Sequence, residues 1–256
     1  MEAARVATIR GHRVTLYEKS GELGGHLIEA AVPDFKHDMN RLLDWYRTQL
    51  RKLKVETKLN TEVTSELVRR ENPDVVIVAT GSTTLIPEIP GVKDNPMVID
   101  CSELLLRMEK AGDKVVIIGG GMDSCETALW LAKQGKSVTV VASHQVMARG
   151  VAESSVRVSA PRAMLLDLLA EKKVQILTYT GVVEVKRDSV IVVDRDFRRK
   201  VIGCDTVVLA PSLKSEKELY ESLIGEFVEL YEIGDCKEPR RIGDAIWDGW
   251  AVGSAI

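Results

Sequence analysis

The chain has 256 residues, a formal net charge of −3, 45% hydrophobic residues and 29% charged residues, the composition of an ordinary soluble globular protein. At about 150 residues per domain, this length fits one large or two small domains. The mildly acidic charge gives no reason to expect nucleic acid, the apolar runs are shorter than the roughly 18 residues of a membrane span, and the N-terminal segment shows no signal peptide.

In chain order, the hydrophobic pattern alternates between helices and short, β-branched strands, which is typical of an α/β fold with parallel sheets. The expected helices are one from Glu2 to a stop at Gly11, then residues 35–53, 62–70, 102–110, one after 119–121, 160–172 and one through 245–247. The expected strands are residues 14–18, one from 55, then 74–79, 114–118, 138–142, 174–177, 205–210 and a weak one at 227–231. Residues 182–193 read as an antiparallel hairpin turning at 187–189.

An internal repeat organises these elements. Residues 2–18 match residues 126–142 at an offset of 124, with identical residues at Glu2, Ala4, Gly11 and Val14-Thr15. A second match, residues 74–79 with 205–210, has an offset of 131. Each copy reads as a helix, a glycine stop and a strand, the second half of a βαβ unit. Two similar nucleotide-binding units are therefore expected in tandem.

The second copy contains a turn that the first lacks. A buried strand at 114–118 and the glycines 119–121 precede its helix, and the matching positions would lie upstream of Met1. A Rossmann unit without this strand lacks the centre of its sheet and the loop that cradles a pyrophosphate. We therefore expect the chain to be a fragment, cut from a longer parent within its first βαβ unit, which without that loop carries no stoichiometric FAD.

The three glycines after the 114–118 strand are placed as in a dinucleotide-binding turn. Glycine lets the backbone approach a pyrophosphate, and the following helix N-terminus supplies unpaired N–H donors. Two departures stand out: Asp123 and Ser124 occupy the end of the fingerprint, and Ala142 replaces the acid that holds a ribose 2′-OH. In the first copy that acid is present as Glu18.

The loss of the acid at Ala142 also removes repulsion against a 2′-phosphate. We therefore expect a site that does not strongly favour NADH. Ser143, His144 or Arg149 are candidates to receive a 2′-phosphate, and a degenerate, weakly binding site is the alternative.

Cysteine and histidine patterns give no metal or thiol signature. No C-x-x-C occurs among the four cysteines, and the four histidines are equally dispersed. We expect small buried thiols, no metal site and a cytoplasmic protein. The residues concerned are Cys101, Cys125, Cys204, Cys236, His12, His26, His37 and His144.

Four segments carry a family resemblance: YEKSGELGGHL at 17–27, ATGS at 79–82 followed by IPEIPG, GGG with CETALWLA at 119–132, and IGDC with AIWDG near the end. They resemble a flavoprotein reductase module that binds two dinucleotides. More narrowly, the chain resembles the C-terminal half of NADH:flavin oxidoreductases of the Old Yellow Enzyme type, which include enoate reductase, dienoyl-CoA reductase and trimethylamine dehydrogenase. Nearly all of the chain is covered.

The resemblance implies two Rossmann-like, three-layer domains, with an NAD(P)-binding domain inserted into an FAD-binding domain and a small antiparallel β crossover. The implied boundaries are 1–99 and 212–256 for the FAD-binding domain and 100–211 for the NAD(P)-binding domain. The cofactors implied here are FAD and NAD(P)H. FMN and a 4Fe-4S cluster are expected only in an N-terminal barrel domain outside this chain, through which an oligomer is also conceivable.

The resemblance also assigns residues. Glu18 and Lys19 would lie at the adenosine ribose of FAD, Gly24, Gly25 and His26 along the cofactor, and Val63 at the adenine. Ala79, Thr80 and Gly81 mark the chain crossing between domains, and Gly234 and Asp235 would contact the ribityl and pyrophosphate region, followed by Ala245. Gly119, Gly121, Met122, Glu126 and Ser143 belong to the nicotinamide dinucleotide site. No catalytic residue is assigned.

Related disulfide reductases carry a redox cysteine pair that is absent here, so electrons taken up by FAD are expected to leave for a cofactor outside this chain. The implied function is an electron-input module of a flavin oxidoreductase that reduces unsaturated acids or thioesters. The alternative is a nucleotide-binding scaffold without redox turnover, as in an amine-dehydrogenase-like protein, because Asp123, Ser124 and Ala142 depart from the fingerprint.

Overall fold

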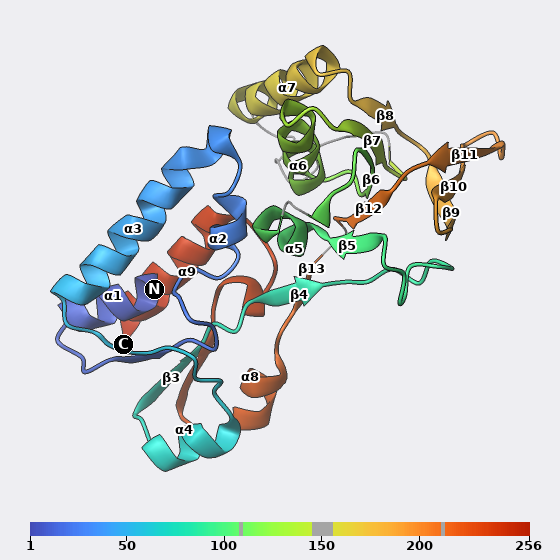
Figure 1. Cartoon of the computed structure of the whole chain (residues 1–256). Helices are drawn as coiled ribbons and strands as arrows, with labels where there is room; N and C mark the ends of the chain where they lie inside the picture. The colour runs from blue at the N-terminus through green and yellow to red at the C-terminus, as the bar shows by residue number, and fades with distance from the viewer. Residues whose placement is uncertain (108–109, 145–155, 211–212) are drawn as a thin grey trace. The chain divides into compact units, whose positions relative to one another are not determined.

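The computed structural model describes residues 1–107, 110–144, 156–210 and 213–256 (Figure 1). The chain divides into two compact units. Unit 1 comprises Met1–Ala31, Lys36–Thr83 and Leu213–Ile256, and unit 2 comprises Val32–Phe35 and Thr84–Ser212. One unit is thus inserted into the other along the chain. The expected assignment of an FAD-binding and an NAD(P)-binding domain, with boundaries at 99/100 and 211/212, stays a prediction.

Unit 2 is built on a five-stranded parallel sheet with the strand order β5-β12-β6-β7-β8. These strands are β5 (Val98–Asp100), β6 (Lys114–Ile118), β7 (Ser137–Val141), β8 (Gln175–Leu177) and β12 (Thr206–Leu209). The central strand, β6, leads into the glycines and α6, as expected. This order is that of a Rossmann-like sheet, in which the strand that leads into the glycine turn, here β6, lies in the middle.

Alternate residues of β6 enter two different cores, because side chains of a strand point to opposite faces. Val115 and Ile117 pack with helices α5 (Cys101–Leu106), α6 (Met122–Lys133) and α7 (Val156–Glu171). Val116 packs with an antiparallel three-stranded sheet on the other face. That sheet has the order β11-β10-β9 and consists of β9 (Gly181–Val185), β10 (Ser189–Val193) and β11 (Arg199–Gly203). Unit 2 therefore has three layers, with helices on one face and the antiparallel ribbon on the other.

Unit 1 contains two separate pairs of parallel strands, β1 with β2 and β3 with β14. These strands are β1 (Thr15–Tyr17), β2 (Glu56–Lys58), β3 (Val75–Val78) and β14 (Glu229–Glu232). The unit also holds helices α1 (Glu2–Ile9), α2 (Leu27–Ala30), α3 (His37–Lys52), α4 (Ser65–Glu71), α8 (Glu218–Leu223) and α9 (Ile242–Ala255). A third pair, β4 (Ser82–Thr84) with β13 (Leu213–Ser215), lies where the chain passes between the units.

The internal repeat is confirmed in three dimensions. The last residue of α1, Ile9, matches the last residue of α6, Lys133, at the offset of 124, and β3 matches β12 residue for residue at the offset of 131. The helix stops also correspond, since Gly11 and Gly135 have φ angles of +102° and +85° with open space around them. Glycine stands at both places because the left-handed conformation, and not a close contact, requires it.

Since β1 matches β7 and β3 matches β12, the parallel pairs β2-β1 and β3-β14 of unit 1 take the places of β8-β7 and β12-β5 in the sheet of unit 2. In unit 2 the strand β6 joins the two pairs into one sheet. Among the described residues of unit 1, no strand pairs with both β1 and β3. Its sheet therefore has the arrangement of unit 2 without a counterpart of the central strand.

Some boundaries differ from the expected ones for local reasons. The helix expected from residue 62 begins at Ser65, because the Thr64 side chain accepts the N–H of Leu67 and caps it. The helix expected at 102–110 begins one residue earlier, after the cap Asp100, and ends at Leu106, where Arg107 leaves the helical region. The helix expected at 35–53 is a 3₁₀ turn, Asp34–Lys36, followed by α3. The helix expected at 160–172 begins earlier, at Val156.

Several short elements were not expected from the sequence. The hairpin at 182–193 has a third strand, β11. The other unexpected elements are α2, β4, β5, β13 and α8, none longer than 6 residues. Such segments are too short to show a clear hydrophobic period.

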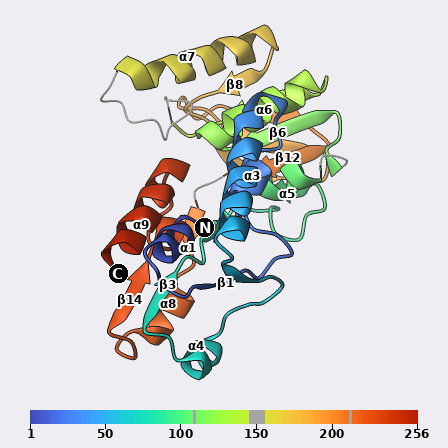
Figure 2. The same ribbon diagram turned by 90° about the vertical axis from the view of Figure 1, so that its left-hand side faces the viewer.

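Helices α1 and α9, from the two ends of the chain, pack closely through glycine (Figure 2). A Cβ atom on Gly249 would lie 3.0 Å from the Ala3 nitrogen, and one on Gly253 would lie 3.0 Å from both the Ala3 oxygen and the Val6 Cβ. The absence of side chains on α9 thus lets the two backbones approach, and Ala3 and Val6 are buried in the contact.

We predict that Gly253→Ala destabilises unit 1 by about 1–3 kcal/mol, because the added methyl group meets the α1 backbone and forces it to shift. Gly243→Ala is the matched control in the same helix, since a Cβ there meets nothing within 4 Å. The control should stabilise the chain by up to about 1 kcal/mol through helix propensity. Urea unfolding followed by tryptophan fluorescence measures both changes, and equal effects of the two variants would contradict the proposed packing.

Candidate functional site

The residues predicted for unit 1 lie beyond the carboxyl ends of its parallel strands. Glu18 and Lys19 follow β1, and Val63 follows β2 by a few residues. Ala79, Thr80 and Gly81 directly follow β3, and Gly234 and Asp235 follow β14, forming a 3₁₀ turn with Cys236. In open parallel sheets, ligands bind outside the carboxyl ends of the strands. The predicted residues therefore share the edge at which a ligand of this fold binds.

His26 connects the Gly24-Gly25 turn to two other segments of unit 1. Its Nδ1 lies 2.6 Å from Glu29 Oε1, and its Nε2 lies 2.8 Å from the Ser82 carbonyl oxygen. Both partners are pure acceptors, and only the protonated imidazolium can donate from both ring nitrogens. The geometry therefore assigns a positive charge to His26.

The same contacts raise the pKa of His26 to about 9, with the hydrogen bond to Glu29 as the main cause and the contact with Ser82 and the charge of Asp235 adding to it. Burial of the ring acts in the opposite direction. At neutral pH, His26 is thus a fixed cation between α2 and the start of β4.

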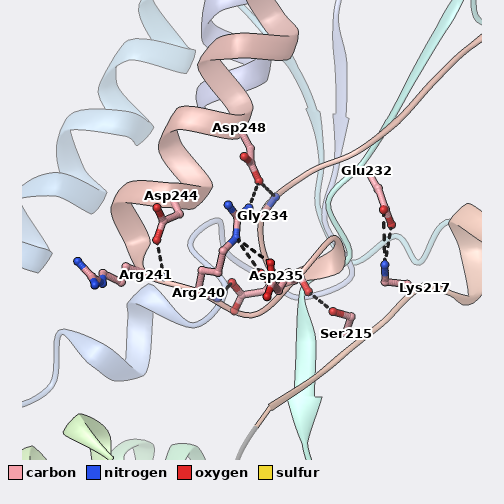
Figure 3. A network of polar contacts seen from close by, with 10 residues as sticks. Ser215, Lys217, Glu232, Gly234, Asp235, Arg240, Arg241, Asp244 and Asp248 are labelled. Atoms are coloured by element: carbon pink, nitrogen blue, oxygen red, sulfur yellow. Dashed lines mark hydrogen bonds and ion pairs between the residues drawn. The ribbon is translucent and has the colours of Figure 1, made fainter. Parts of the chain in front are cut away.

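A polar network continues from Ser82 into the C-terminal part of unit 1. The Ser82 hydroxyl donates to Asp235 Oδ2 at 3.1 Å, and the Asp235 carbonyl accepts from the Ser215 hydroxyl at 2.7 Å. Figure 3 shows Asp235 and its neighbours: Arg240 donates its backbone N–H to Asp235 and its guanidinium to Asp248. Asp235 therefore accepts hydrogen bonds from three residues, Ser82, Ser215 and Arg240.

The turn at Gly234 is fixed by the helix that follows. Asp248, on α9, accepts the N–H of Gly234 at 3.0 Å, and Gly234 has a φ of +61°. A Cβ on Gly234 would lie 3.4 Å from the Ala245 Cβ. At the start of α9, the Asp244 side chain accepts the N–H of Arg241 (Figure 3). The network thus orients the Gly234-Asp235 turn toward the first turns of α9.

This edge of unit 1 offers an open stretch of backbone and a carboxylate, the types of group that bind a dinucleotide. Gly25 has a φ of +53° with open space around it, whereas a Cβ on Gly24 would meet Ile28 and Leu43 at 2.7 and 2.8 Å. Gly25 therefore leaves backbone open to a ligand, and Gly24 serves packing. Glu18 is half-buried, and one carboxylate oxygen accepts the N–H of Ser20 at 2.8 Å. Thr80 is tied by its hydroxyl to the Glu216 carbonyl at 2.5 Å, which fixes the crossing segment.

In unit 2 the turn between β6 and α6 has the form expected for a pyrophosphate site. Gly119 has a φ of +146°, and a Cβ there would lie 2.2 Å from the Ala210 carbonyl oxygen, so that only glycine fits. Gly121 is the N-cap of α6 and has no side chain with which to cap it. Among the hydrogen bonds of the described residues, none joins a side chain to the N–H groups of Met122, Asp123 or Ser124, which leaves them available to an anion at the helix N-terminus.

The other predicted residues of this unit surround the same turn. Met122 begins α6, and Glu126 lies one turn further along it. Ser124 is buried with its hydroxyl 3.5 Å from the Ala210 carbonyl, whereas Asp123 is exposed and does not cap the helix. Its carboxylate is therefore left beside the first turn, where it opposes a bound phosphate.

Beyond β7, the buried Ala142 is followed by Ser143, whose hydroxyl lies 2.9 Å from His144 Nδ1. No acid stands at the end of this strand. Arg149, the third candidate for a 2′-phosphate, lies outside the described residues.

All four cysteines are buried. Over the part of the chain that the structure describes, no group of three potential metal ligands occurs, and no helix has both the length and the apolar character to cross a membrane.

Comparison with known proteins places the chain in a family. The family described as "Pyridine nucleotide-disulphide oxidoreductase" matches residues 1–226. The chain belongs to this family.

Among its relatives, the chain is 37% identical to cinnamate reductase of Clostridium sporogenes and 36% identical to bilirubin reductase of Mediterraneibacter gnavus, each over all of this chain. It covers 37% and 39% of those proteins. A solved complex of 2-naphthoyl-CoA reductase superposes over the whole chain with a TM-score of 0.91 at 32% identity, and the chain covers 38% of it. The chain thus has the fold of the pyridine nucleotide-disulphide oxidoreductase family. It resembles one part of longer reductases, as expected from its resemblance to flavin oxidoreductases.

The prediction from sequence missed the residues that connect the candidate site of unit 1. Glu29, Arg240 and Asp248 bind His26, Asp235 and Gly234, but no sequence motif distinguishes them from the other charged residues of the chain. The one available signal was spacing, because Glu29 is three residues beyond His26 and Asp248 is four beyond Asp244, on one face of a helix each.

We predict that the stability of unit 1 decreases as the pH rises through about 9. The pKa of His26 is about 9 in the folded chain and 6.5 ordinarily, so its stabilising contribution is complete below about pH 6.5 and is lost above 9. Urea unfolding across this range should show a decline that His26→Gln reduces. His37→Gln, at a position whose side chain is 75% exposed, should leave the decline unchanged. An NMR titration of the His26 ring with a midpoint at or below 6.5 would contradict the assignment.

Proposed function

We propose that unit 2 binds NAD(P)H at the β6–α6 turn and that unit 1 contributes to an FAD site at its carboxyl edge. The single observation that carries the proposal is the turn at Gly119–Gly121, which directs the uncapped N-terminus of α6 to the carboxyl edge of a parallel sheet. The repeated unit and the family of pyridine nucleotide-disulphide oxidoreductases support a second nucleotide in unit 1.

In unit 2, the first-turn N–H groups of α6 bind the pyrophosphate, and Gly119 lets the backbone turn tightly enough to place them. Ser143 lies beside the adenosine ribose. The residues proposed for this site are Gly119, Gly121, Met122, Glu126 and Ser143.

In unit 1, the half-buried carboxylate of Glu18 accepts a ribose hydroxyl, and Gly25 offers backbone contact. Asp235 accepts hydrogen bonds from the ribityl side, held in place by Ser82 and Arg240. Bound FAD would take a hydride from the nicotinamide and pass on electrons singly or in pairs. The residues proposed for this site are Glu18, Lys19, Gly25, His26, Val63, Ala79, Thr80, Gly81, Gly234, Asp235 and Ala245, whereas Gly24 has a packing role against Ile28 and Leu43.

The activity of a longer protein is part of the same proposal. The chain spans 37–39% of the length of its first curated relatives. We infer that the rest of such a protein is a barrel domain with FMN and a 4Fe-4S cluster that receives the electrons. The similarity to cinnamate reductase and 2-naphthoyl-CoA reductase favours an unsaturated acid or thioester as the substrate.

Two features of the β6–α6 site favour a second candidate function, a nucleotide-binding scaffold. Asp123 is exposed beside the pyrophosphate turn, and β7 ends at Ala142 without an acid. Both features weaken a nicotinamide dinucleotide site. A scaffold that holds an adenine nucleotide without redox turnover would tolerate them.

Titration of the full-length protein with NADH and NADPH separates the two functions. For an electron-input module, we predict that the flavin absorption at about 450 nm bleaches within one to two equivalents, because the FAD accepts the hydride. Tight nucleotide binding without bleaching would instead establish the scaffold.

We further predict that the 256-residue chain, purified by itself, carries no stoichiometric FAD and shows no reductase activity. The described part of unit 1 has no counterpart of the β6–Gly119–α6 turn, so the FAD diphosphate lacks a cradle of N–H donors. Absorbance after denaturation measures the flavin released per polypeptide. A purified chain that is yellow and releases one flavin per polypeptide would refute this prediction.

A further inference from the structure

A second group of charged and aromatic residues lies beside the end of β7, apart from the turn that binds the pyrophosphate. The N–H of Thr180 bonds to the Ala142 carbonyl at 3.0 Å, and the N–H of Tyr179 bonds to the His144 carbonyl at 3.5 Å. The segment after β8 therefore runs alongside Ser143 and His144. In a Rossmann unit this is the side on which the adenosine ribose projects its 2′ position.

The turn between β10 and β11 reaches the same place. Strand β10, which leads into this turn, ends at Val193. Val193 pairs with Gly181, the residue that directly follows Thr180. A cavity of about 300 Å³ is lined by Thr178, Tyr179, Asp194, Arg195 and Asp196. The Arg195 guanidinium carbon lies 5.9 Å from the centre of the Tyr179 ring, within the range of a cation–π contact. The guanidinium thus contacts an aromatic ring of the segment that runs alongside Ser143 and His144.

The two carboxylates of this cavity are already engaged. Asp194 Oδ1 accepts the N–H groups of Asp196 and Arg198 at 2.9 and 3.0 Å. The Arg198 guanidinium pairs with both Asp194 and Asp196. Among the described residues, Arg195 forms no ion pair. Its charge is therefore available to an anion, although it stands between two acidic residues in the sequence.

We propose that Arg195, held on Tyr179, binds the 2′-phosphate of NADPH and makes this unit selective for the phosphorylated dinucleotide. A guanidinium binds a phosphate through two parallel, charge-assisted hydrogen bonds. The absence of an acid at Ala142 fits this assignment, because a carboxylate there would repel the phosphate. The inference rests on the proposed NAD(P)H site of unit 2 and names its specificity residue.

Calorimetric titration of the 256-residue chain with 2′,5′-ADP, 5′-AMP and inorganic phosphate tests the proposal without any turnover. The wild-type chain should bind 2′,5′-ADP at least about tenfold more tightly than 5′-AMP, since charged hydrogen bonds contribute that much or more. Phosphate alone should bind far more weakly than 2′,5′-ADP if the adenosine is recognised as well. Equal binding of the two nucleotides would overturn the proposal but not the nucleotide site, and no binding of either would overturn both.

Variants assign the preference to one residue. Arg195→Gln should reduce the affinity for 2′,5′-ADP at least about tenfold and leave that for 5′-AMP within about twofold, while Arg195→Lys should retain part of the preference. Arg187→Gln is the matched control, because this exposed arginine stands before β10 and Arg195 stands after it. A preference that survives Arg195→Gln but is lost in Arg149→Gln would overturn the assignment.

Discussion

The close approach of Gly119 to the carbonyl oxygen of Ala210 is the constraint on which the proposed nucleotide site of unit 2 depends. A Cβ at position 119 would lie 2.2 Å from that oxygen. Glycine therefore lets the chain leave β6, turn sharply beside the end of β12 and enter α6 with its first N–H groups at the carboxyl edge of the sheet. The positive end of the helix dipole, the uncapped donors and the neighbouring end of β7 all come together because of this one turn.

Unit 1 holds the corresponding edge by different means. Its strands form two pairs, and its ligand-facing segments are connected by a charged network that runs from Glu29 through His26 and Ser82 to Asp235. An imidazolium between two acceptors can donate to only one of them once it loses its proton, which makes His26 a positioning residue for the Gly24-Gly25 turn. Charged hydrogen bonds thus fix the conformation of this edge in unit 1, whereas a steric constraint at Gly119 fixes that of the edge in unit 2.

Much of the fold was predictable because the chain contains two copies of one unit. Apart from their first residues, Lys114 and Thr206, strands β6 and β12 are apolar, mostly β-branched and largely buried, so their pattern is unambiguous. The glycines at 24–25 and 119–121 likewise indicated, from the sequence, where the chain turns at the carboxyl edges of the sheets. The His26 and Asp235 networks and the Arg195–Tyr179 contact were not predictable, since their partners are 56, 153 and 16 residues away and no local spacing reports such contacts.

Hydrogen–deuterium exchange of the 256-residue chain, with and without saturating NADP⁺, tests the central claim that unit 2 binds a dinucleotide at its carboxyl edge. The account predicts slower exchange at the first amides of α6, residues 122–124, and at residues 143–144, because the phosphates bind amides at the helix N-terminus that have no acceptor within the helix. Residues 112–114, at the opposite end of β6, should exchange unchanged. Protection confined to that opposite end, or none in the first turn of α6, would contradict the account.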